Sequence, residues 1–522
     1  MRKRNKLKIH SGLAITLAIL MSFIGISGVF VTAASEDGGT RVPVYKNLEE
    51  LSGKRVGVQV GSVFDKIVEE AIPGASVEYY STFPDEINAL KASKLEGVAC
   101  VESVIIQLQA QDDSIAYIEE PIGAVPLGFL FPKNEKGKKL ADQMSEFLTN
   151  MRESGEMDRL MAVWNETDES LKPIEDYKSL PAENGTLTFV TEGTFPPFDY
   201  FREGELVGYD VDVAIRFCKE YGYGIELKDM NFDALMPAVQ SGKCDFAASG
   251  IAITEERKEK VYFSAPDYYQ DAYVVVLAAD RSGGSFISSL KDSFNRTFIK
   301  EHRYRLFLKG IWVTLAITVM SIIFGTLLGF ILYMWCRKGG KPANAITRFC
   351  IWLVQGMPAI VLLMILYYVV FGKADIGGIG VAVIGFTMTF AASVYSMILS
   401  GVRAVDFGQT EASYALGFND TQTFFGIILP QAARHFMPTF KAEIVTLIKA
   451  TAVVGYIAVQ DLTKMGDIVR SSTYEAFFPL IAVAVMYFVL AGLLKLVANK
   501  LTASVDPEKR SEEKILKGIK TK

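Results

Sequence analysis

The sequence predicts a multidomain chain in which an α/β clamshell of two lobes is followed by an all-α membrane domain of five helices. Beyond the N-terminal segment, long windows without charge occur only after residue 305 of the 522 residues. Residues 47–280 instead alternate predicted strands and helices, which is typical of α/β units with parallel sheets. A mean hydropathy of +0.24 lies between the values of soluble and all-membrane chains, so the composition agrees with this mixture.

The N-terminal segment, residues 1–35, has the pattern of a secretion signal. Five basic residues between Arg2 and Lys8 precede the uncharged stretch 11–35. Small residues at 32–34 suit a cleavage site, so we expect a signal peptide. An uncleaved anchor is the alternative, because the apolar stretch is long for a signal. In both cases the residues that follow are exported.

Two α/β units are expected in the exported part, over residues 36–170 and 186–285. A strand at 55–60 runs into the turn Gly61-Ser62, and a second strand at 187–191 is followed by a turn from Gly193 to Pro197. Residues 171–185 contain Glu, Asp, Lys and Pro and are interpreted as a linker. Two such lobes with a cleft between them would suit a small ligand.

The membrane domain is predicted over residues 305–500, after a linker at 286–304 and before a tail at 501–522. Charge-free windows cover 310–336, 349–372, 376–402 and 476–494, and Lys449 alone interrupts the stretch 444–460. A bilayer core needs about 20 apolar residues in a helix, so these stretches predict five spans. The first inner loop holds four basic residues between Arg337 and Arg348 and no acid. The positive-inside rule then places the loop 403–441 and the tail in the cytoplasm.

Composition and motifs argue against several functions. The 54 basic and 59 acidic side chains nearly balance, which gives no strong cationic field for nucleic acid. Three histidines leave little room for a histidine-rich metal site, and no nucleophile–base constellation is recognisable. The phosphate-cradling pattern Gly-x-x-x-x-Gly-Lys-Ser/Thr does not occur. We therefore expect no enzyme activity, no resident metal or cofactor, and no ATP site in this chain.

The exported part carries motifs that resemble a known family. In order along the chain these are LSGKRVGVQ (51–59), VTEGTFPPFD (190–199), VGYDVD (207–212), FDALMP (232–237), SGKCD (241–245) and ITEER (253–257). The last five resemble the first lobe of the polar amino-acid-binding proteins of ABC importers, and the run at 51–59 resembles the opening of their second lobe. The resemblance implies a periplasmic-binding-protein-like clamshell.

The order of these parts differs from that of the family, in which the first lobe precedes the second. Here the second lobe and the return segment come first. One circularly permuted binding domain would use every part once, whereas the alternative is two truncated copies that each lack a lobe. We expect the permutation, because a lone lobe would expose its ligand face and its sheet edge.

The resemblance also implies a site for an amino-acid zwitterion. Arg257 matches the arginine that holds the ligand carboxylate, and a guanidinium can give a carboxylate two parallel hydrogen bonds. Ser249 and the backbone of Gly250 and Ala252 are expected to add donors. The family often has a hydroxyl residue at the position of Ala252, so one side-chain contact is missing here.

Further ligand contacts are expected from both lobes. Phe195 and Phe232 match the aromatics that enclose the ligand's aliphatic part. Glu192 matches an acidic position and favours a cationic or amide ligand side chain. The second lobe offers Ser62 and, as a partner for the ligand ammonium, Glu102. Glu102 is one residue beyond Val101, which stands at the expected position, and a shift of one residue on a strand reverses the side chain's face.

The membrane half contains the most specific pattern in the chain. QTEASYALG (409–417) is followed after nine residues by IILP (427–430), which is the spacing of the coupling loop in ABC importer permeases. The residues expected to contact an ATPase are Glu411, Ala412, Gly417, Ile427, Leu429 and Pro430. The resemblance to polar amino-acid permeases extends over 305–500. It implies a type I ABC importer transmembrane domain, a homodimer, and ATP hydrolysis by a separate subunit.

The sequence thus predicts the substrate-binding and permease subunit of an ABC importer in the plasma membrane of a bacterium. Its ligand would be glutamine, glutamate or a basic amino acid, bound outside, while the coupling loop and the C-terminus lie inside. The alternative is an amino-acid-sensing membrane receptor or a ligand-gated channel built on the same clamshell. Such channels place the pore segment between the lobes, whereas the predicted spans here follow both lobes.

Overall fold

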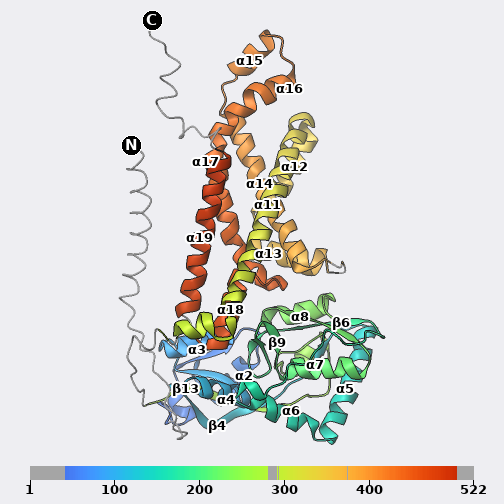
Figure 1. Cartoon of the computed structure of the whole chain (residues 1–522), viewed down its shortest axis with the longest axis vertical. Helices are drawn as coiled ribbons and strands as arrows, with labels where there is room; N and C mark the ends of the chain where they lie inside the picture. Colours follow the sequence, from blue (N-terminus) through green and yellow to red (C-terminus); the bar gives the residue numbers. More distant parts are fainter. Residues whose placement is uncertain are drawn as a thin grey trace.

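The computed structural model of this chain describes residues 42–279, 291, 293–372, 374, 376–475 and 477–502. The expected signal or anchor at 1–35 and nearly all of the tail at 501–522 lie outside the described residues. An α/β part forms one end of an elongated molecule, and long helices stand on it (Figure 1). The short helices α15 and α16 lie at the opposite end of the helical bundle (Figure 1).

The first sheet has the order β2-β1-β3-β13-β4. Its strands are β1 (Arg55–Gln59), β2 (Ser76–Tyr80), β3 (Gly97–Val101), β4 (Ile115–Pro126) and β13 (Tyr269–Leu277). β1 pairs in parallel with β2 and β3, whereas β13 is antiparallel to β3 and β4. The connecting helices are α2 (Phe64–Ala71), α3 (Phe83–Lys91) and α4 (Glu102–Gln111). All five residues of β3 are buried, as expected for a central strand covered on both faces.

The second sheet repeats this plan in the order β10-β6-β11-β5-β12. Its strands are β5 (Leu130–Phe131), β6 (Thr186–Thr191), β10 (Gly224–Asp229), β11 (Phe246–Ala247) and β12 (Tyr262–Phe263). β6 is parallel to β10 and β11, and β5 is antiparallel to β11 and β12. Its helices are α5 (Glu135–Glu153), α6 (Glu156–Asn165), α7 (Tyr209–Glu220), α8 (Phe232–Ser241) and α9 (Glu255–Lys258). A small sheet of β7 (Thr194–Phe195), β8 (Asp199–Arg202) and β9 (Glu205–Val207) accompanies it.

Each sheet takes its fourth strand from the other half of the α/β part. β5 follows β4 of the first sheet in sequence, and β13 follows β12 of the second sheet. The sequence analysis placed all of 186–285 in one lobe, but the structure moves β13 to the other sheet. The alternation of strands and helices identified the strand correctly and carried no information about its partners.

The membrane half is mostly helical, as predicted. Its long elements are α11 (Tyr304–Lys338), α12 (Gly340–Gln355), α14 (Gly378–Arg403), α17 (Leu429–Ala450), α18 (Leu462–Thr473) and α19 (Phe477–Leu501). Within the described ranges, α11, α14 and α19 are long and apolar enough to cross a membrane alone. Two bent pairs, 340–355 with 359–370 at 107° and 420–457 with 462–473 at 57°, would raise the number to five. The first bend falls at Pro358, because a residue that precedes proline disfavours helical geometry.

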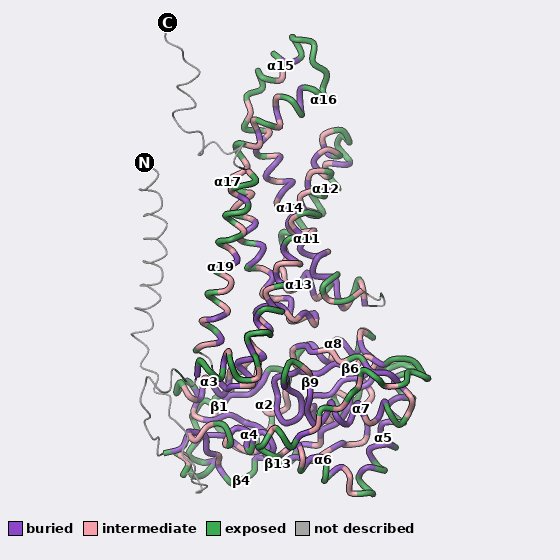
Figure 2. Tube along the Cα trace, in the orientation of Figure 1, coloured by how far each residue is buried: buried purple, intermediate pink, exposed green. Residues whose placement is uncertain are grey.

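Packing within the bundle differs from helix to helix. The most apolar window of α14 is 67% buried, whereas that of α19 is 17% buried. Figure 2 shows the same contrast, with purple concentrated in the α/β lobes and on α14. Gly325 and Gly329 lie one turn apart on α11 where it meets α14. A Cβ at Gly329 would lie 2.6 Å from the carbonyl oxygen of Ala391, so the close helix contact requires glycine there.

Candidate functional site

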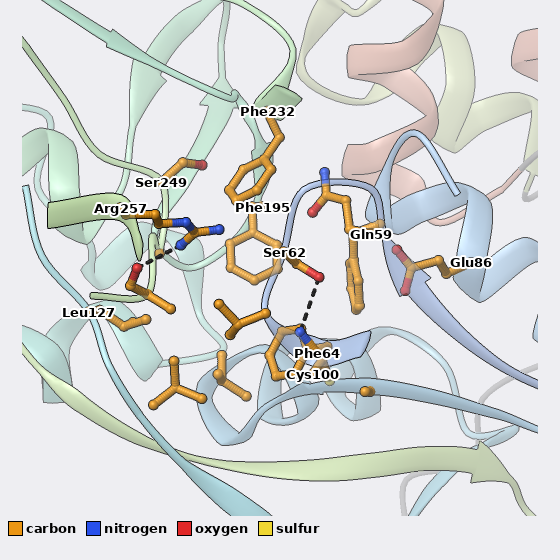
Figure 3. A pocket seen from close by; sticks show the side chains of 17 residues that line it. Gln59, Ser62, Phe64, Glu86, Cys100, Leu127, Phe195, Phe232, Ser249 and Arg257 are labelled. Carbon is orange, nitrogen blue, oxygen red and sulfur yellow. Dashed lines mark hydrogen bonds between the residues drawn. The ribbon is translucent and has the colours of Figure 1, made fainter. Parts of the chain in front are cut away.

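A cavity lies between the two lobes, at the carboxyl ends of their parallel strands. Gln59 ends β1, Val101 ends β3, and Ser249 follows β11. The space between the lining side chains is about 510 Å³, including its opening to solvent. This position, where loops leave the strand ends, is the usual ligand site of open α/β sheets. Figure 3 shows the lining side chains, which come from both lobes.

Arg257 lines this cavity, where the sequence predicted it. Thr254 caps α9, and its Oγ1 accepts a hydrogen bond from the backbone nitrogen of Arg257. The guanidinium donates to the carbonyl oxygens of Ala252 and Gly61, each at 2.6 Å. Gly61 belongs to the lobe built on the first sheet (the first lobe along this chain, which resembles the family's second lobe), so Arg257 also joins it to the lobe built on the second sheet (the second lobe along this chain). Burial lowers the pKa of Arg257, which is the expected effect on a cation removed from water.

Of the other groups expected to donate to a ligand carboxylate, one lines the cavity and two are engaged within the protein. Ser249 is buried at the cavity wall, as expected. The backbone nitrogen of Gly250 donates to Oδ2 of Asp210 at 2.9 Å, so this amide is already engaged within its own lobe. The carbonyl oxygen of Ala252 accepts from Arg257. The backbone at Gly250 and Ala252 therefore positions other groups of the site.

Aromatic side chains from both lobes meet in the cavity. Phe195 and Phe232 line it, as predicted. Phe83, at the start of α3 in the first lobe, also lines it and was missed. The rings of Phe83 and Phe195 are edge to face, with centroids 5.6 Å apart. A Cβ at Gly250 would lie 2.9 Å from Phe195, so glycine at this position, with φ +54°, leaves room for the ring.

Glu192 does not line the cavity but contacts Gln59, which does. It is buried directly after β6, and its Oε2 accepts a hydrogen bond at 2.9 Å from Nε2 of Gln59, which lines the cavity. Burial raises the pKa of Glu192 to about 7, and the nearby charge of Lys464 opposes that rise. Glu192 and Gln59 come from different lobes, so this contact also crosses the cleft.

The first lobe brings only some of its expected residues to the cavity. Ser62 and Val101 line it. Glu102 is exposed and is the first residue of α4, outside the cavity lining. The chain turns from β3 into α4 at this residue, so the Glu102 side chain faces solvent, and the cavity lining gives no support to the predicted contact with a ligand ammonium.

Glu86 is a cavity residue that the sequence analysis missed. It lies on α3, three residues after Phe83, and both side chains line the cavity. Neither of its carboxylate oxygens has a hydrogen-bond partner among the described residues. Burial raises the pKa of Glu86 well above its ordinary value, and Glu192 adds to the rise. The signal available in the sequence was an acid at helical spacing from the apolar residues Phe83 and Leu90.

The helix α18 connects the membrane half to both lobes. Nζ of Lys464 lies 3.4 Å from Oδ2 of Asp229 in the second lobe, and both side chains are buried. Arg470 pairs at 2.7 Å with Asp85 on α3 of the first lobe. This contact was not predicted. The available signal was a charge at every third position from Asp461 to Arg470, in a short helix next to apolar spans.

The predicted coupling loop forms two short helices, α15 (Gly408–Ala415) and α16 (Asp420–Thr423). Gly417 lies between them at φ +85°, a conformation that favours glycine. Glu411, Ala412 and Pro430 are exposed, and Ile427 and Leu429 are half-buried where the loop joins α17.

The base of this loop is fixed by contacts with the end of α11. Arg337 forms an ion pair with Asp420, and its guanidinium lies 4.3 Å from the ring centre of Phe424. Asn419 and Gln422 form a capping box that begins α16. Leu416 at the tip is 77% exposed.

The chain joins a cavity between two α/β lobes to helices long enough to cross a membrane. This combination indicates a component of a solute transporter. Residues 187–455, more than half of the chain, match the bacterial extracellular solute-binding proteins, family 3, and the chain belongs to this family. The matching region extends from the second lobe into the membrane half.

Relatives of the membrane half are permeases. The putative glutamine transport system permease protein GlnP of Rickettsia conorii is 32% identical over 196 residues, which are 37% of this chain and 88% of that protein. The arginine transport system permease protein ArtQ of Bacillus subtilis is 32% identical over 197 residues, 37% of this chain and 89% of that protein. The solved structure of an amino acid ABC transporter with histidines shares 27% identity, covers 42% of this chain and 99% of its own, and has a TM-score of 0.36. The chain is therefore a substrate-binding and permease component of an amino acid ABC importer.

Proposed function

We propose that this chain captures a polar amino acid outside a bacterial cell membrane and passes it through its own helices, driven by an ATPase subunit inside. The observation that carries the proposal is the position of the two sites in one chain. The ligand cavity lies at one end of the molecule and the coupling loop at the other, with the apolar helices between them (Figure 1). A binding event and an energy input on opposite sides of a membrane need this arrangement.

The cavity suits the chemistry of an amino acid. Arg257 supplies a guanidinium that would exchange its two carbonyl partners for a ligand carboxylate, since an ionised acceptor makes the stronger hydrogen bond. Ser249 and Ser62 place hydroxyl groups in the same wall. Phe195, Phe232 and Phe83 would enclose the aliphatic part of the ligand.

The two lobes are proposed to be one circularly permuted clamshell. The exchange of β5 and β13 supports this interpretation, because neither sheet reaches its five-strand order without a strand from the other half. The exported fragment 36–285 should then unfold in a single transition that amino acid shifts upward, since a ligand bound only to the folded form stabilises it. Two separate transitions, with ligand shifting one of them, would indicate two truncated copies.

The complete importer is proposed to contain two copies of this chain and a separate ATPase that docks on residues 411–430. The decisive experiment is uptake of a panel of labelled amino acids into vesicles that contain the chain and its ATPase. We expect accumulation of a polar amino acid that requires ATP hydrolysis. Uptake or ion current in vesicles without the ATPase would instead favour a channel.

A further inference from the structure

Glu86 is a buried carboxylate without a partner in the cavity wall. Its side chain is fully buried on α3, and neither oxygen has a hydrogen-bond partner among the described residues. The side chain packs over β1, because a Cβ added at Gly57 would lie 3.6 Å from its Cγ. The helix and the strand therefore hold the carboxylate at the cavity.

The surroundings of Glu86 supply no cation. Within the part of the chain that the structure describes, no Lys or Arg forms an ion pair with it. Its neighbour Asp85 is a second acid and is engaged by Arg470. Across the cavity, Gln59 donates its amide to Glu192, a second buried acid. An ionised carboxylate in such a place costs several kcal/mol unless a partner arrives, as a rough general magnitude.

The cavity has opposite chemistry at its two ends. Figure 3 shows Arg257 on one side, Glu86 on the other, and the rings of Phe195 and Phe232 between them. A complementary ligand has a carboxylate at one end, an apolar stem in the middle and a cation at the far end. Amino acids with an aliphatic chain and a terminal amine or guanidinium have this form.

We propose that Glu86 is a specificity-determining residue that accepts hydrogen bonds from the terminal cation of a basic amino acid whose carboxylate is bound by Arg257. This inference rests on the proposed function, since it requires that an amino acid occupies this cavity. Glu86 selects among amino acids because a neutral ligand leaves its carboxylate unpaired, whereas a cationic ligand removes that cost.

The test compares ligands that differ in charge and little in shape. The full-length chain is purified in lipid nanodiscs, and its affinities for arginine, for citrulline, which is a neutral isostere of arginine, and for glutamine are measured by calorimetry at pH 7. Glu86→Gln keeps the shape of the side chain and removes its charge. Glu78→Gln, at an exposed position on β2 of the same lobe, makes the same change in net charge away from the cavity.

We expect the wild-type chain and Glu78→Gln to prefer arginine over citrulline. Glu86→Gln should weaken arginine binding by at least about 30-fold and change citrulline binding by less than about threefold, because only the cation loses a buried partner. A thermal midpoint without ligand that is equal to or above that of the wild type would show that the variant folds, since it removes an unpaired buried acid.

Three results would overturn the proposal. Equal losses for arginine and citrulline would mean that Glu86 acts through the shape of the cavity. A wild-type chain that binds glutamine or citrulline and not arginine would refute the role of Glu86 while the proposed function stands. A chain that binds no amino acid would refute the proposed function, and with it this inference.

Discussion

The ligand cavity and the coupling loop are built in opposite ways. The cavity gathers side chains from β1, α3, β7 and α9, which are far apart in sequence and belong to both lobes. The coupling loop is one continuous segment, with both helices and the glycine between them inside 408–423. A local site depends on backbone conformation, whereas an assembled site depends on how the lobes meet. Substitutions in the cavity should therefore reduce amino-acid binding, whereas substitutions in the coupling loop should reduce ATP-driven uptake and leave binding unchanged.

The largest effect is expected at Gly417. Its φ of +85° is unfavourable for any residue with a Cβ and most of all for a β-branched one, so Gly417→Val should deform the turn between α15 and α16. We expect ATP-driven uptake into vesicles to fall to background while amino-acid affinity stays unchanged. Glu411→Lys should act in the same direction by reversing charge on the exposed face of α15.

Gly426 provides the matched control for that change. A Cβ has open space at both glycines, but Gly426 has no positive φ. Gly426→Val should therefore retain most uptake. Normal ATP-dependent uptake by Gly417→Val would show that the geometry of this loop does not transmit nucleotide-driven motion.

The same contrast explains what the sequence could predict. The turn at Gly417 in the predicted coupling loop could be placed from the sequence, because the spacing and the glycine are properties of one segment, while the contact with an ATPase stays a prediction. In the cavity, Arg257, Phe195 and Phe232 were found from motifs in the second lobe, and they line it. Glu86 and Phe83 were missed, because only the meeting of the lobes brings α3 to the ligand. The sequence predicts a buried strand at 273–277, within β13, but the pairing of β13 with the first sheet depends on a chain crossing that carries no local pattern.

Arg257→Ala should have the second largest effect. An unpaired ligand carboxylate in the closed cavity costs on the order of 2–5 kcal/mol, which corresponds to an affinity loss of roughly 30-fold or more. The variant also loses the contact with Gly61 that joins the lobes. Arg257→Lys keeps the charge and should recover part of the affinity, because a single ammonium cannot give two parallel bonds. Unchanged binding by Arg257→Ala in calorimetry would exclude this residue from the site.

Lys464 tests whether the cavity and the membrane half are energetically connected. Lys464→Met leaves Asp229 buried without its cation, a change that typically costs on the order of 3–5 kcal/mol. We expect a lower thermal midpoint for the clamshell in the full-length chain. Asp229→Asn added to Lys464→Met should restore most of it, since the double variant no longer buries the charge of Asp229 without its cation. If the double variant is as unstable as the single one, the loss comes from packing of α18.

The smallest expected effect is a dependence of affinity on pH, and it separates the cavity from the coupling loop because only the cavity contains the responsible acids. Burial raises the pKa of Glu192 to about 7 and that of Glu86 well above its ordinary value, so the ligand-free cavity holds protons near neutral pH. A cationic ligand favours the ionised acids and lowers their pKa, and protons are released on binding. Affinity for arginine should therefore rise with pH up to about 7, by at most about tenfold per pH unit for each proton released.

Several polar and ionisable groups face Glu86 and Glu192 and can influence their pKa values. They are Gln59 on β1, Asp85 on α3, Cys100 on β3, Asp199 on β8, Asp229 on β10 and Lys464 on α18. Within the described part of the chain histidine does not contribute, because neither His302 nor His435 is among the residues that line the cavity. Glu192→Gln should remove the step near pH 7, and glutamine should bind with little change across the same range because it brings no cation. If the affinity for arginine falls as pH rises from 5 to 7, the two acids do not bind the cation in ionised form. If the affinity for glutamine changes with pH as steeply as that for arginine, the pH dependence comes from closure of the lobes.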